Sequence, residues 1–273
     1  MMDTEQLISG KDNPKIKYIR SLHNRKTAIK EGVIFVEGVR LCEDALVSGF
    51  SPIIIVYQDS KRSLVATWLK RFHVFENTQL LCVTEPVFSK IASTVSPQGV
   101  AAVFLTPKYI TNTDDTRFQR IFVCENVSDP GNLGNIMRSA EAFDFCELIL
   151  VGRCADPYNE KVLRSSMGAC FRLRIRQESS CEEVCLQLKQ AGVQLVATHL
   201  SGRPLSEAVF KCKVAVFLGN EAHGLSEECS DACDTLIKIP MPGHAESLNV
   251  ASAAAILSYV LMQEHSLMCT EDQ

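Results

Sequence analysis

The sequence predicts an α/β protein of two domains, in which a small α/β domain precedes a larger one built on a parallel sheet. The chain has 273 residues and 46% hydrophobic content, and about 150 residues per domain gives an expectation of two domains. Short apolar runs alternate with stretches of helical period in both halves, which is typical of sheets covered by helices. A polar segment separates the halves.

Four apolar runs in the first half have the length and composition of strands, and helical patterns such as Leu41–Ser48 and Ser63–Phe72 lie between them. The runs are VIFVEG, IIIVY, LLCV and GVAAVF. They predict a small α/β domain over residues 1–106. The next segment, PKYITNTDDTR, contains Pro and an Asp-Asp pair and has no apolar period, so residues 107–117 are interpreted as a linker.

Six further strand signals follow in residues 118–273, again separated by helical patterns. They are IFVCENV, ELILVG, LRIR, QLVATHL, VAVFLG and TLIKIP. This alternation predicts a largely parallel sheet covered on both faces. The last helix candidate, Leu248–Met262, is apolar almost all round and must be buried on several sides. It is either a central core helix or a subunit interface, and it can be both.

The composition is that of an ordinary soluble globular protein of the cytoplasm. The first residues are polar and contain no apolar signal or anchor segment, and no apolar stretch reaches the roughly 20 residues that span a bilayer. Twelve cysteines are scattered along the chain, without a secretory context, and are interpreted as free thiols. Cys181 and Cys185, like Cys229 and Cys233, are spaced for one helix face. Without nearby histidines they are expected to be small core residues, and no metal site is expected.

The net charge of −4 argues against indiscriminate binding of polyanions but permits a local basic patch. Between Lys11 and Lys30 there are seven Lys and Arg residues against one Asp, a local balance of +6. This pattern fits either a solvated helix face or a surface that contacts phosphates. Candidate RNA contacts here are Lys15, Lys17, Arg20, Arg25 and Lys26.

Three loops that follow predicted strands carry most of the polar residues of interest. In an open parallel sheet, ligands bind beyond the carboxyl ends of the strands. The loops contain SDPGNLGNIMRSAEAF after the first C-terminal strand, NEAHGLSEE after VAVFLG, and MPGHAESLNVASAAA after TLIKIP. The glycines of the first loop do not have the dinucleotide-binding spacing GxGxxG, and a Walker lysine is absent.

Each loop taken alone has a plain structural interpretation. Asn132 is suited to cap the helix that follows it, and Ser247 is suited to the same role at the last helix. Arg138 fits a surface ion pair, and Gly219 and Gly224 fit a tight turn. The turn does not account for the Asn220-Glu221 pair between the glycines.

Taken together, the strings DPGNLGNIMRSAEAF, FLGNEAHGLS and IPMPGHAESLNVASAAAI resemble the three ordered motifs of the SpoU (TrmH-like) family of the SPOUT superfamily, RNA 2′-O-ribose methyltransferases. The resemblance covers about 150 residues in the right order. The segment NPKIKYIRSLHNRK followed by GVIFVEGVRLCEDAL resembles the N-terminal substrate-binding domain of many members. The resemblance implies a trefoil knot in the C-terminal domain, S-adenosylmethionine as methyl donor and RNA as partner. The apolar last helix, if it packs against another subunit, predicts a homodimer.

By this resemblance, Arg138 acts on the ribose 2′-hydroxyl with Asn132 beside it, and Glu221, Ser247 and Asn249 complete the catalytic set. Because an arginine stays protonated in proteins, we expect it to hold the adjacent phosphate and to stabilise charge on the oxygen rather than to act as a base. The residues implied to line the donor site are Thr198, Leu200, Gly219, Asn220, Ile239, Met241 and Leu248. Arg164 is a further candidate for RNA contact, or else an exposed helix cation.

The resemblance leaves the target open. Ribosomal RNA of the 23S type is favoured, and transfer RNA is the alternative. A knotted enzyme that methylates a base is a second alternative, against which Asn132, Arg138 and the Ser247-Leu248-Asn249 run argue. A catalytically silent RNA-binding assembly factor is a third, and it would be free to lose polar residues that are all present here.

Overall fold

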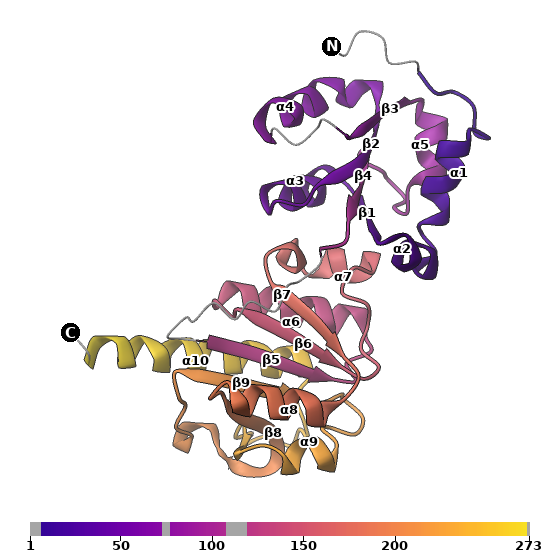
Figure 1. Cartoon of the computed structure of the whole chain (residues 1–273). Helices are drawn as coiled ribbons and strands as arrows, with labels where there is room; N and C mark the ends of the chain where they lie inside the picture. The colour runs from indigo at the N-terminus through magenta and orange to yellow at the C-terminus, as the bar shows by residue number, and fades with distance from the viewer. Residues whose placement is uncertain (1–6, 73–76, 108–118, 272–273) are drawn as a thin grey trace. The chain divides into compact units, whose positions relative to one another are not determined.

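The computed structural model of the chain divides into two compact units, Met1–Lys108 and Tyr109–Gln273 (Figure 1). It describes residues 7–72, 77–107 and 119–271, with side chains as far as Glu264. Apart from Pro107, the predicted linker 107–117 lies outside the described residues. Within the described residues, no helix combines the length and the apolar character that crossing a membrane requires.

The first unit contains a four-stranded sheet in the order β1-β4-β2-β3. Its strands are β1 (Val33–Glu37), β2 (Pro52–Gln58), β3 (Gln79–Val83) and β4 (Val100–Leu105). All four predicted apolar runs of the first half are therefore strands. The central strand β4 is antiparallel to both of its neighbours, while β2 and β3 are parallel.

Helices cover both faces of this sheet, because successive strand side chains point to opposite sides. One apolar core joins strand residues such as Phe35 and Val56 to Ile16 and Ile19 of α1 (Pro14–Ser21) and to Phe88 of α5 (Glu85–Ile91). On the other face lie α3 (Val39–Val47) and α4 (Arg62–Phe72) (Figure 1). A short helix α2 (Arg25–Glu31) and a 3₁₀ turn η1 (Asp59–Lys61) complete the unit. The small α/β domain is confirmed.

The second unit contains six parallel strands in the order β10-β8-β9-β5-β6-β7. The strands are β5 (Gln119–Glu125), β6 (Glu147–Val151), β7 (Arg174–Glu178), β8 (Gln194–Pro204), β9 (Lys213–Leu218) and β10 (Thr235–Lys238). The predicted parallel sheet is confirmed. Its central strands are nearly continuous runs of buried residues, as expected of a sheet covered on both faces.

Two helix layers cover the sheet of the second unit. Cys181, Val184 and Leu188 of α8 (Cys181–Gln190) and Cys229 of α9 (Glu227–Asp231) pack on one face. The other layer includes α6 (Pro130–Ala142) and α10 (Val250–Glu271), which contact each other; in Figure 1, α10 passes behind the sheet and α8 lies in front of it. The remaining elements are α7 (Glu160–Ser165), η2 (Ala169–Phe171) and η3 (Leu205–Glu207).

The last helix is only partly buried within a single chain, and the choice between a core helix and a subunit interface stays a prediction. Ala254, Leu257 and Leu261 are fully buried, but Ile256 and Tyr259 keep 38% and 48% of their surfaces exposed. Within a single chain, the helix is therefore not buried on every side. An apolar run of this kind does not show how many faces of the helix are buried within the same chain.

The cysteine prediction is wrong for two residues. Cys181 and Cys229 form a disulfide with a Cα–Cα distance of 6.0 Å, although they are 48 positions apart in sequence. Spacing within each helix indicated a shared face, but it could not show that the two faces meet across the α8–α9 contact. The nine other cysteines among the described residues are free thiols.

Candidate active site

The three polar loops lie at one edge of the second sheet. They follow β5, β9 and β10, and because these strands are parallel their carboxyl ends point the same way. The sequence placed the loops after strands, and the topology now gathers them at a common edge. The geometry of each loop determines which side chains remain available for a ligand.

The first loop leads into α6, and its N-cap is Asp129 rather than Asn132. The Asp129 carboxylate accepts a hydrogen bond from the Asn132 N–H at 2.8 Å, which lowers the pKa of Asp129 below its ordinary value. Pro130 occupies the first turn, where its missing N–H costs nothing. The capping interpretation of Asn132 is therefore wrong, and its side-chain amide is available for other partners.

The second loop is closed by its own residues. A Cβ on Gly219 would lie 2.0 Å from the carbonyl carbon of Gly224, so only glycine permits this close approach. The Asn220 side-chain oxygen accepts hydrogen bonds from the N–H groups of Ala222 at 2.9 Å and His223 at 2.8 Å. Asn220 therefore fixes the turn, and Glu221 is left exposed within it.

The third loop ends at α10, which is capped by Asn249. The Asn249 side-chain oxygen accepts hydrogen bonds from Ala251 N–H at 2.9 Å and Ser252 N–H at 3.4 Å. The expectation that Ser247 caps this helix is wrong, because the helix begins at Val250, two residues later than that role requires. Ser247 is exposed.

One side chain joins all three loops. The Asn132 amide nitrogen donates a hydrogen bond to Glu221, and its amide oxygen accepts one from the Asn249 amide at 2.9 Å. These partners are 89 and 117 positions away in sequence. The structure thus brings together three of the five residues of the implied catalytic set, Asn132, Glu221 and Asn249, into a group that we call the amide triad.

The other two residues of that set lie outside the triad. Arg138 is exposed on α6, six positions after Asn132, and Ser247 is exposed two positions before Asn249. Among the described side chains, the hydrogen bonds of the triad include neither of them.

The residues implied to line the donor site lie on β8 and on the loops that follow β9 and β10. β10 pairs with Ala197 and then with Arg203, so the intervening residues of β8 leave the ladder. Within this bulge Leu200 is 69% exposed, while Thr198 donates a hydrogen bond to the Phe217 carbonyl at 2.9 Å. Leu248 is 36% exposed. Ile239 and Met241 are half-buried after β10.

Glu125 is a further site residue that the sequence analysis did not single out. It is buried at the end of β5, with 7% of its surface exposed. Its two carboxylate oxygens accept hydrogen bonds from Ser226 N–H and Ser226 Oγ, both at 2.8 Å. Glu125 therefore ties the loop after β9 to the strand before α6. The signal was a carboxylate at the end of an apolar run, IFVCE, where burial requires partners.

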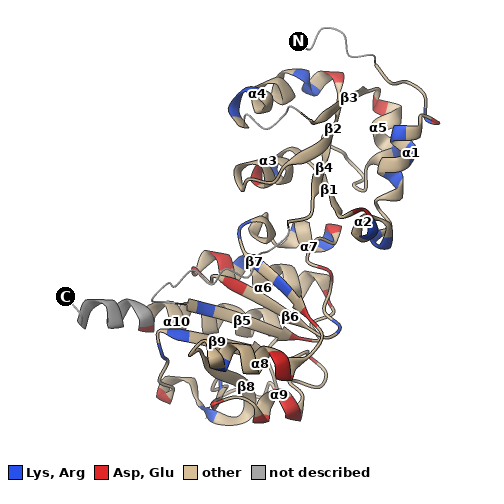
Figure 2. Ribbon diagram, in the orientation of Figure 1, with Lys and Arg blue, Asp and Glu red and all other residues tan. Residues whose placement is uncertain are grey.

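The candidate RNA contacts have different surroundings. Lys15, Lys17, Arg20 and Lys26 are exposed on α1 and α2, and the blue segments of these helices in Figure 2 mark their Lys and Arg residues. Lys17 is 3.1 Å from Asp12. Arg25 is half-buried and donates a hydrogen bond to the Val33 carbonyl at 3.2 Å. In the second unit, Arg164 pairs weakly with Glu160 at 3.8 Å and is exposed.

Comparison with known proteins agrees with the motifs. The family model described as the SpoU rRNA methylase family matches residues 119–259. The chain belongs to this family. A model of the MRM3-like substrate binding domain matches residues 13–102 of the same chain. The resemblance inferred from the motifs is therefore confirmed in both halves.

Relatives match over nearly the whole length. The 23S rRNA (guanosine(2553)-2′-O)-methyltransferase RlmP of Bacillus subtilis is 33% identical, over 94% of this chain and 99% of its own. The 23S rRNA (uridine(2479)-2′-O)-methyltransferase of Streptomyces viridochromogenes is 30% identical, over 89% and 87%. The crystal structure of an AdoMet-bound rRNA methyltransferase from Sinorhizobium meliloti has a TM-score of 0.81 and 30% identity, covering 95% of this chain and 98% of that one.

Proposed function

We propose that this SpoU family enzyme transfers a methyl group from S-adenosylmethionine to a ribose 2′-hydroxyl in ribosomal RNA of the 23S type. The observation that carries the proposal is the amide triad, in which Asn132 holds Glu221 and Asn249 at one edge of the sheet. The three side chains converge from distant loops beyond the carboxyl ends of parallel strands, where such sheets bind ligands. Two full-length relatives are named as 23S rRNA 2′-O-methyltransferases.

The bulge of β8 and the loops beside it fit S-adenosylmethionine. Thr198–Gly202 lie between the two stretches of β8 that β10 pairs with, so their backbone groups are outside that ladder and can recognise an adenine and an amino-acid group. Leu200 and Leu248 expose apolar surface that an adenine ring would cover. When bound, the donor supplies a methyl group on a sulfonium that is already an activated leaving group.

Arg138 and the amide triad act on the acceptor side. The Arg138 guanidinium is exposed on α6 and presents several N–H donors, so it can hold the phosphate next to the target ribose. Its charge then stabilises the negative charge that develops on the 2′-oxygen. The triad holds the loops in register, and the Glu221 carboxylate offers a negative charge near the positive donor.

The first unit is proposed to hold the RNA target through its basic helices. Lys15, Arg20 and Lys26 are exposed there and can contact phosphates. Arg25 has a structural role as well, because it also bonds the Val33 carbonyl. Arg164 is proposed as a contact in the second unit.

The assembly is proposed to be a cytoplasmic homodimer of chains with a trefoil knot. The partly exposed apolar side chains of α10, Ile256 and Tyr259, support the dimer, since apolar surface that is exposed in a single chain can be covered at an interface. The knot is proposed from the family match over residues 119–259.

Alkaline hydrolysis tests the reaction directly. Cleavage of RNA by alkali requires a free 2′-hydroxyl, so a methylated ribose leaves the following bond uncut. We expect ribosomal RNA from a gene-deletion strain, treated with the protein and S-adenosylmethionine, to gain one gap in its partial-hydrolysis ladder. Transfer RNA from the same strain is the parallel arm.

The outcomes separate the alternatives. A gap in transfer RNA alone would move the target to that class. Methyl incorporation without alkali resistance would establish base methylation instead. No incorporation into any RNA, with RNA binding retained, would favour the silent assembly factor.

A further inference from the structure

Met167 follows α7 and combines two features that are uncommon for a large apolar residue. Its φ is +51°, which lies in the left-handed region that residues other than Gly, Asn and Asp seldom adopt. Its surface is also 41% exposed. Strained backbone of this kind persists where the surrounding structure enforces it, and it is concentrated at functional sites. Met167 is therefore a candidate functional residue outside the amide triad.

A tight turn from Ser166 to Ala169 fixes the backbone of Met167. The Ala169 N–H donates a hydrogen bond to the Ser166 carbonyl at 3.0 Å, and the two central residues, Met167 and Gly168, have φ of +51° and +81°. Positive φ at both positions defines a type I′ turn, in which asparagine and glycine are the usual central residues. Ser166 is fully buried, and its hydroxyl donates to the Leu163 carbonyl at 3.2 Å. The chain therefore holds a methionine where asparagine would fit the backbone at lower cost.

This turn lies along the face of α6 that carries Arg138. A Cβ on Gly134 would be 2.9 Å from the Ser166 nitrogen, so glycine lets the end of α7 lie directly against α6. Farther along, Arg172 donates a hydrogen bond to Glu141 at 2.7 Å, and η2 contacts α6 between these two points. Gly134, Arg138 and Glu141 are four and three positions apart, which places them on one helix face. Arg138 therefore lies beside the segment that joins the two contacts, and that segment contains the turn.

Two exposed arginines lie near Met167. The Met167 N–H donates a hydrogen bond to the Arg164 carbonyl at 3.3 Å, and Arg164 and Arg138 are both exposed. The ion pair between Arg164 and Glu160, at 3.8 Å, is exposed and weak, so the guanidinium can turn to another anion. RNA presents phosphates that cations hold and bases whose faces stack on other side chains. An apolar side chain beside two cations therefore matches a stretch of RNA.

We propose that Met167 binds RNA by packing on the face of the base next to the phosphate that Arg138 holds, with Arg164 on a further phosphate. Nucleic-acid-binding proteins use apolar side chains, methionine among them, against the faces of bases. The fixed turn favours such a contact, because a side chain on an ordered backbone loses less freedom on binding. The inference rests on the proposed function, since it takes Arg138 as the residue that holds the phosphate beside the target ribose.

Met167→Asn separates this role from a structural one. Asparagine adopts positive φ at lower cost, so the melting temperature of the variant should equal or exceed that of wild type, although the apolar contact is lost. With 23S-type ribosomal RNA from a gene-deletion strain as the probe, kcat/KM for methyl transfer should fall about tenfold, a usual effect of losing one base contact. Calorimetry should show an unchanged affinity for S-adenosylmethionine. A structural role would instead lower stability and activity together.

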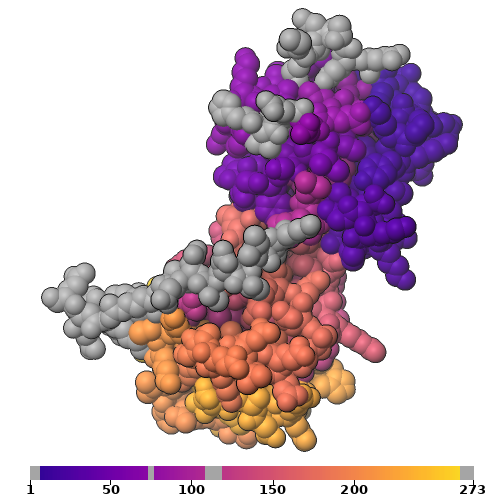
Figure 3. Space-filling model, viewed as in Figure 1, coloured from indigo at the N-terminus to yellow at the C-terminus, as the bar shows by residue number. Residues whose placement is uncertain are grey.

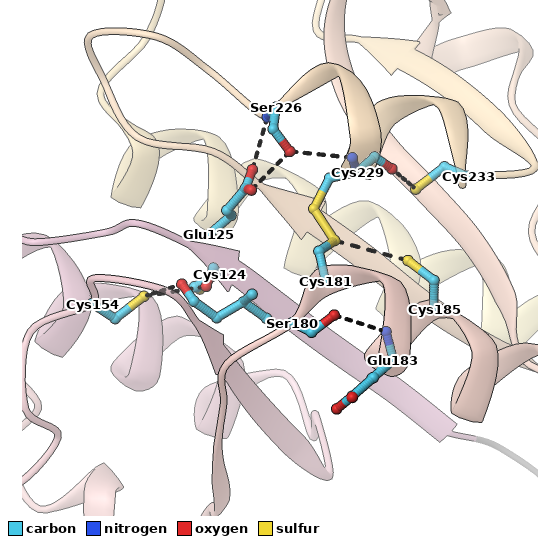
Figure 4. The surroundings of a disulfide bond; sticks show 11 residues. Cys124, Glu125, Cys154, Ser180, Cys181, Glu183, Cys185, Ser226, Cys229 and Cys233 are labelled. Carbon is cyan, nitrogen blue, oxygen red and sulfur yellow. Dashed lines mark hydrogen bonds between the residues drawn. A yellow bond between two sulfur atoms is a disulfide. The ribbon is translucent and has the colours of Figure 1, made fainter.

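Two further variants complete the test. Met167→Leu keeps the apolar surface and the volume, so its kcat/KM should stay within about threefold of wild type. Leu186→Asn is the matched control, because Leu186 is 57% exposed on α8, across the sheet from α6. The face that carries α8 is the one seen in Figure 3, and the disulfide from Cys181 to Cys229 joins α8 to α9 (Figure 4). The control should stay folded, with an unchanged rate of methyl transfer.

Ultraviolet cross-linking to the same RNA tests the contact without requiring catalysis. The cross-linked wild-type protein is digested, and mass spectrometry should map a base to Met167. A cross-link at Met167 in a wild-type protein that transfers no methyl group would support the base contact and count against the proposed function alone.

Four results would overturn the base contact. The first is an equal kcat/KM in wild type and Met167→Asn. The second is a melting temperature of Met167→Asn that falls along with its activity, because Met167 would then have a structural role. The third is a monomeric Met167→Asn in light scattering beside a dimeric wild type, which would assign the exposed surface to a subunit interface. The fourth is the absence of a cross-link at Met167.

Discussion

Asn132 shows how one side chain can organise a site that no local segment contains. An amide has donors on its nitrogen and an acceptor on its oxygen. Here the nitrogen donates a hydrogen bond to Glu221, and the oxygen accepts one from Asn249. An aspartate at this position would lack the donor, and a lysine would lack the acceptor. Since Asp129 caps the helix, the Asn132 side chain is available to connect the loops.

Asn132→Asp should therefore weaken the site. At neutral pH the new carboxylate would face Glu221 and repel it, while Asn249 would still find an acceptor. We expect methyl transfer to fall about tenfold or more, as for the loss of a hydrogen bond to a charged group. Adding Glu221→Gln restores a hydrogen bond between the two side chains. It should therefore recover the affinity for S-adenosylmethionine, measured by calorimetry. Equal affinity of the single and double variants would show that the contact does not hold the donor loop.

Arg138→Ala tests the separation of donor binding from chemistry. Because the arginine is assigned to the acceptor side, S-adenosylmethionine affinity should stay within a few-fold of wild type. Turnover should fall by about 10²–10³-fold, the usual cost of removing one donor that stabilises a developing oxyanion. Calorimetry and methyl incorporation measure the two quantities. Arg138→Lys keeps the charge and should recover part of the turnover, and loss of donor binding in Arg138→Ala would contradict the assignment.

At the scale of elements, the sequence predicted every strand and the helix patterns that it named. Buried parallel strands are nearly continuous apolar runs, so VAVFLG and IFVCENV were visible as strands without any partner in view. The sequence also predicted that the three polar loops follow strands, and the sheet topology adds that they share one edge. These features depend on residues close together in the chain.

The predictions that depended on contacts between distant segments were less complete. The local pattern predicts Asn132 and Ser247 as helix caps, but the caps are Asp129 and Asn249. Several residues near each helix start have side chains suited to capping, and the backbone conformation decides which of them is the cap. The Cys181–Cys229 pair required knowledge that α8 and α9 meet. The bond between Glu125 and Ser226 likewise joins the end of β5 to the loop after β9, 101 positions away in sequence.

The basic helices of the first unit give a prediction at the element scale. Deleting them would remove Ile16 and Ile19, which are fully buried in the core, so charge reversal is the cleaner test. Lys15→Glu with Lys26→Glu should lower RNA affinity and flatten its salt dependence by about one unit of slope per lost phosphate contact.

The affinity for S-adenosylmethionine should not change in the Lys15→Glu, Lys26→Glu double variant. Lys70→Glu reverses an exposed charge on α4, across the sheet from α1, and is the matched control. If the salt dependence of RNA affinity is unaltered in the double variant, α1 and α2 do not contact RNA phosphates and form only a solvated basic surface.

At the scale of the whole molecule, the exposed side of α10 predicts the assembly. Ile256 and Tyr259 expose apolar surface on this helix, and acidic replacements there should separate a homodimer into monomers. Light scattering at micromolar concentration should report a dimer for wild type and a monomer for Ile256→Glu with Tyr259→Glu. Val47→Glu makes a similar change at a residue that is 61% exposed in the first unit, and it should leave the dimer intact. A wild-type monomer would refute the prediction.

The hydrogen bond from Asn249 to Asn132 also has a consequence for synthesis. It spans 117 positions, and a chain emerges from the ribosome with its N-terminal domain first. The sheet strands are therefore complete before the residue that closes the amide triad is available. A nascent or prematurely terminated chain has a folded first domain and most of the second sheet, but no assembled site. The site therefore assembles only after Asn249 has left the ribosome.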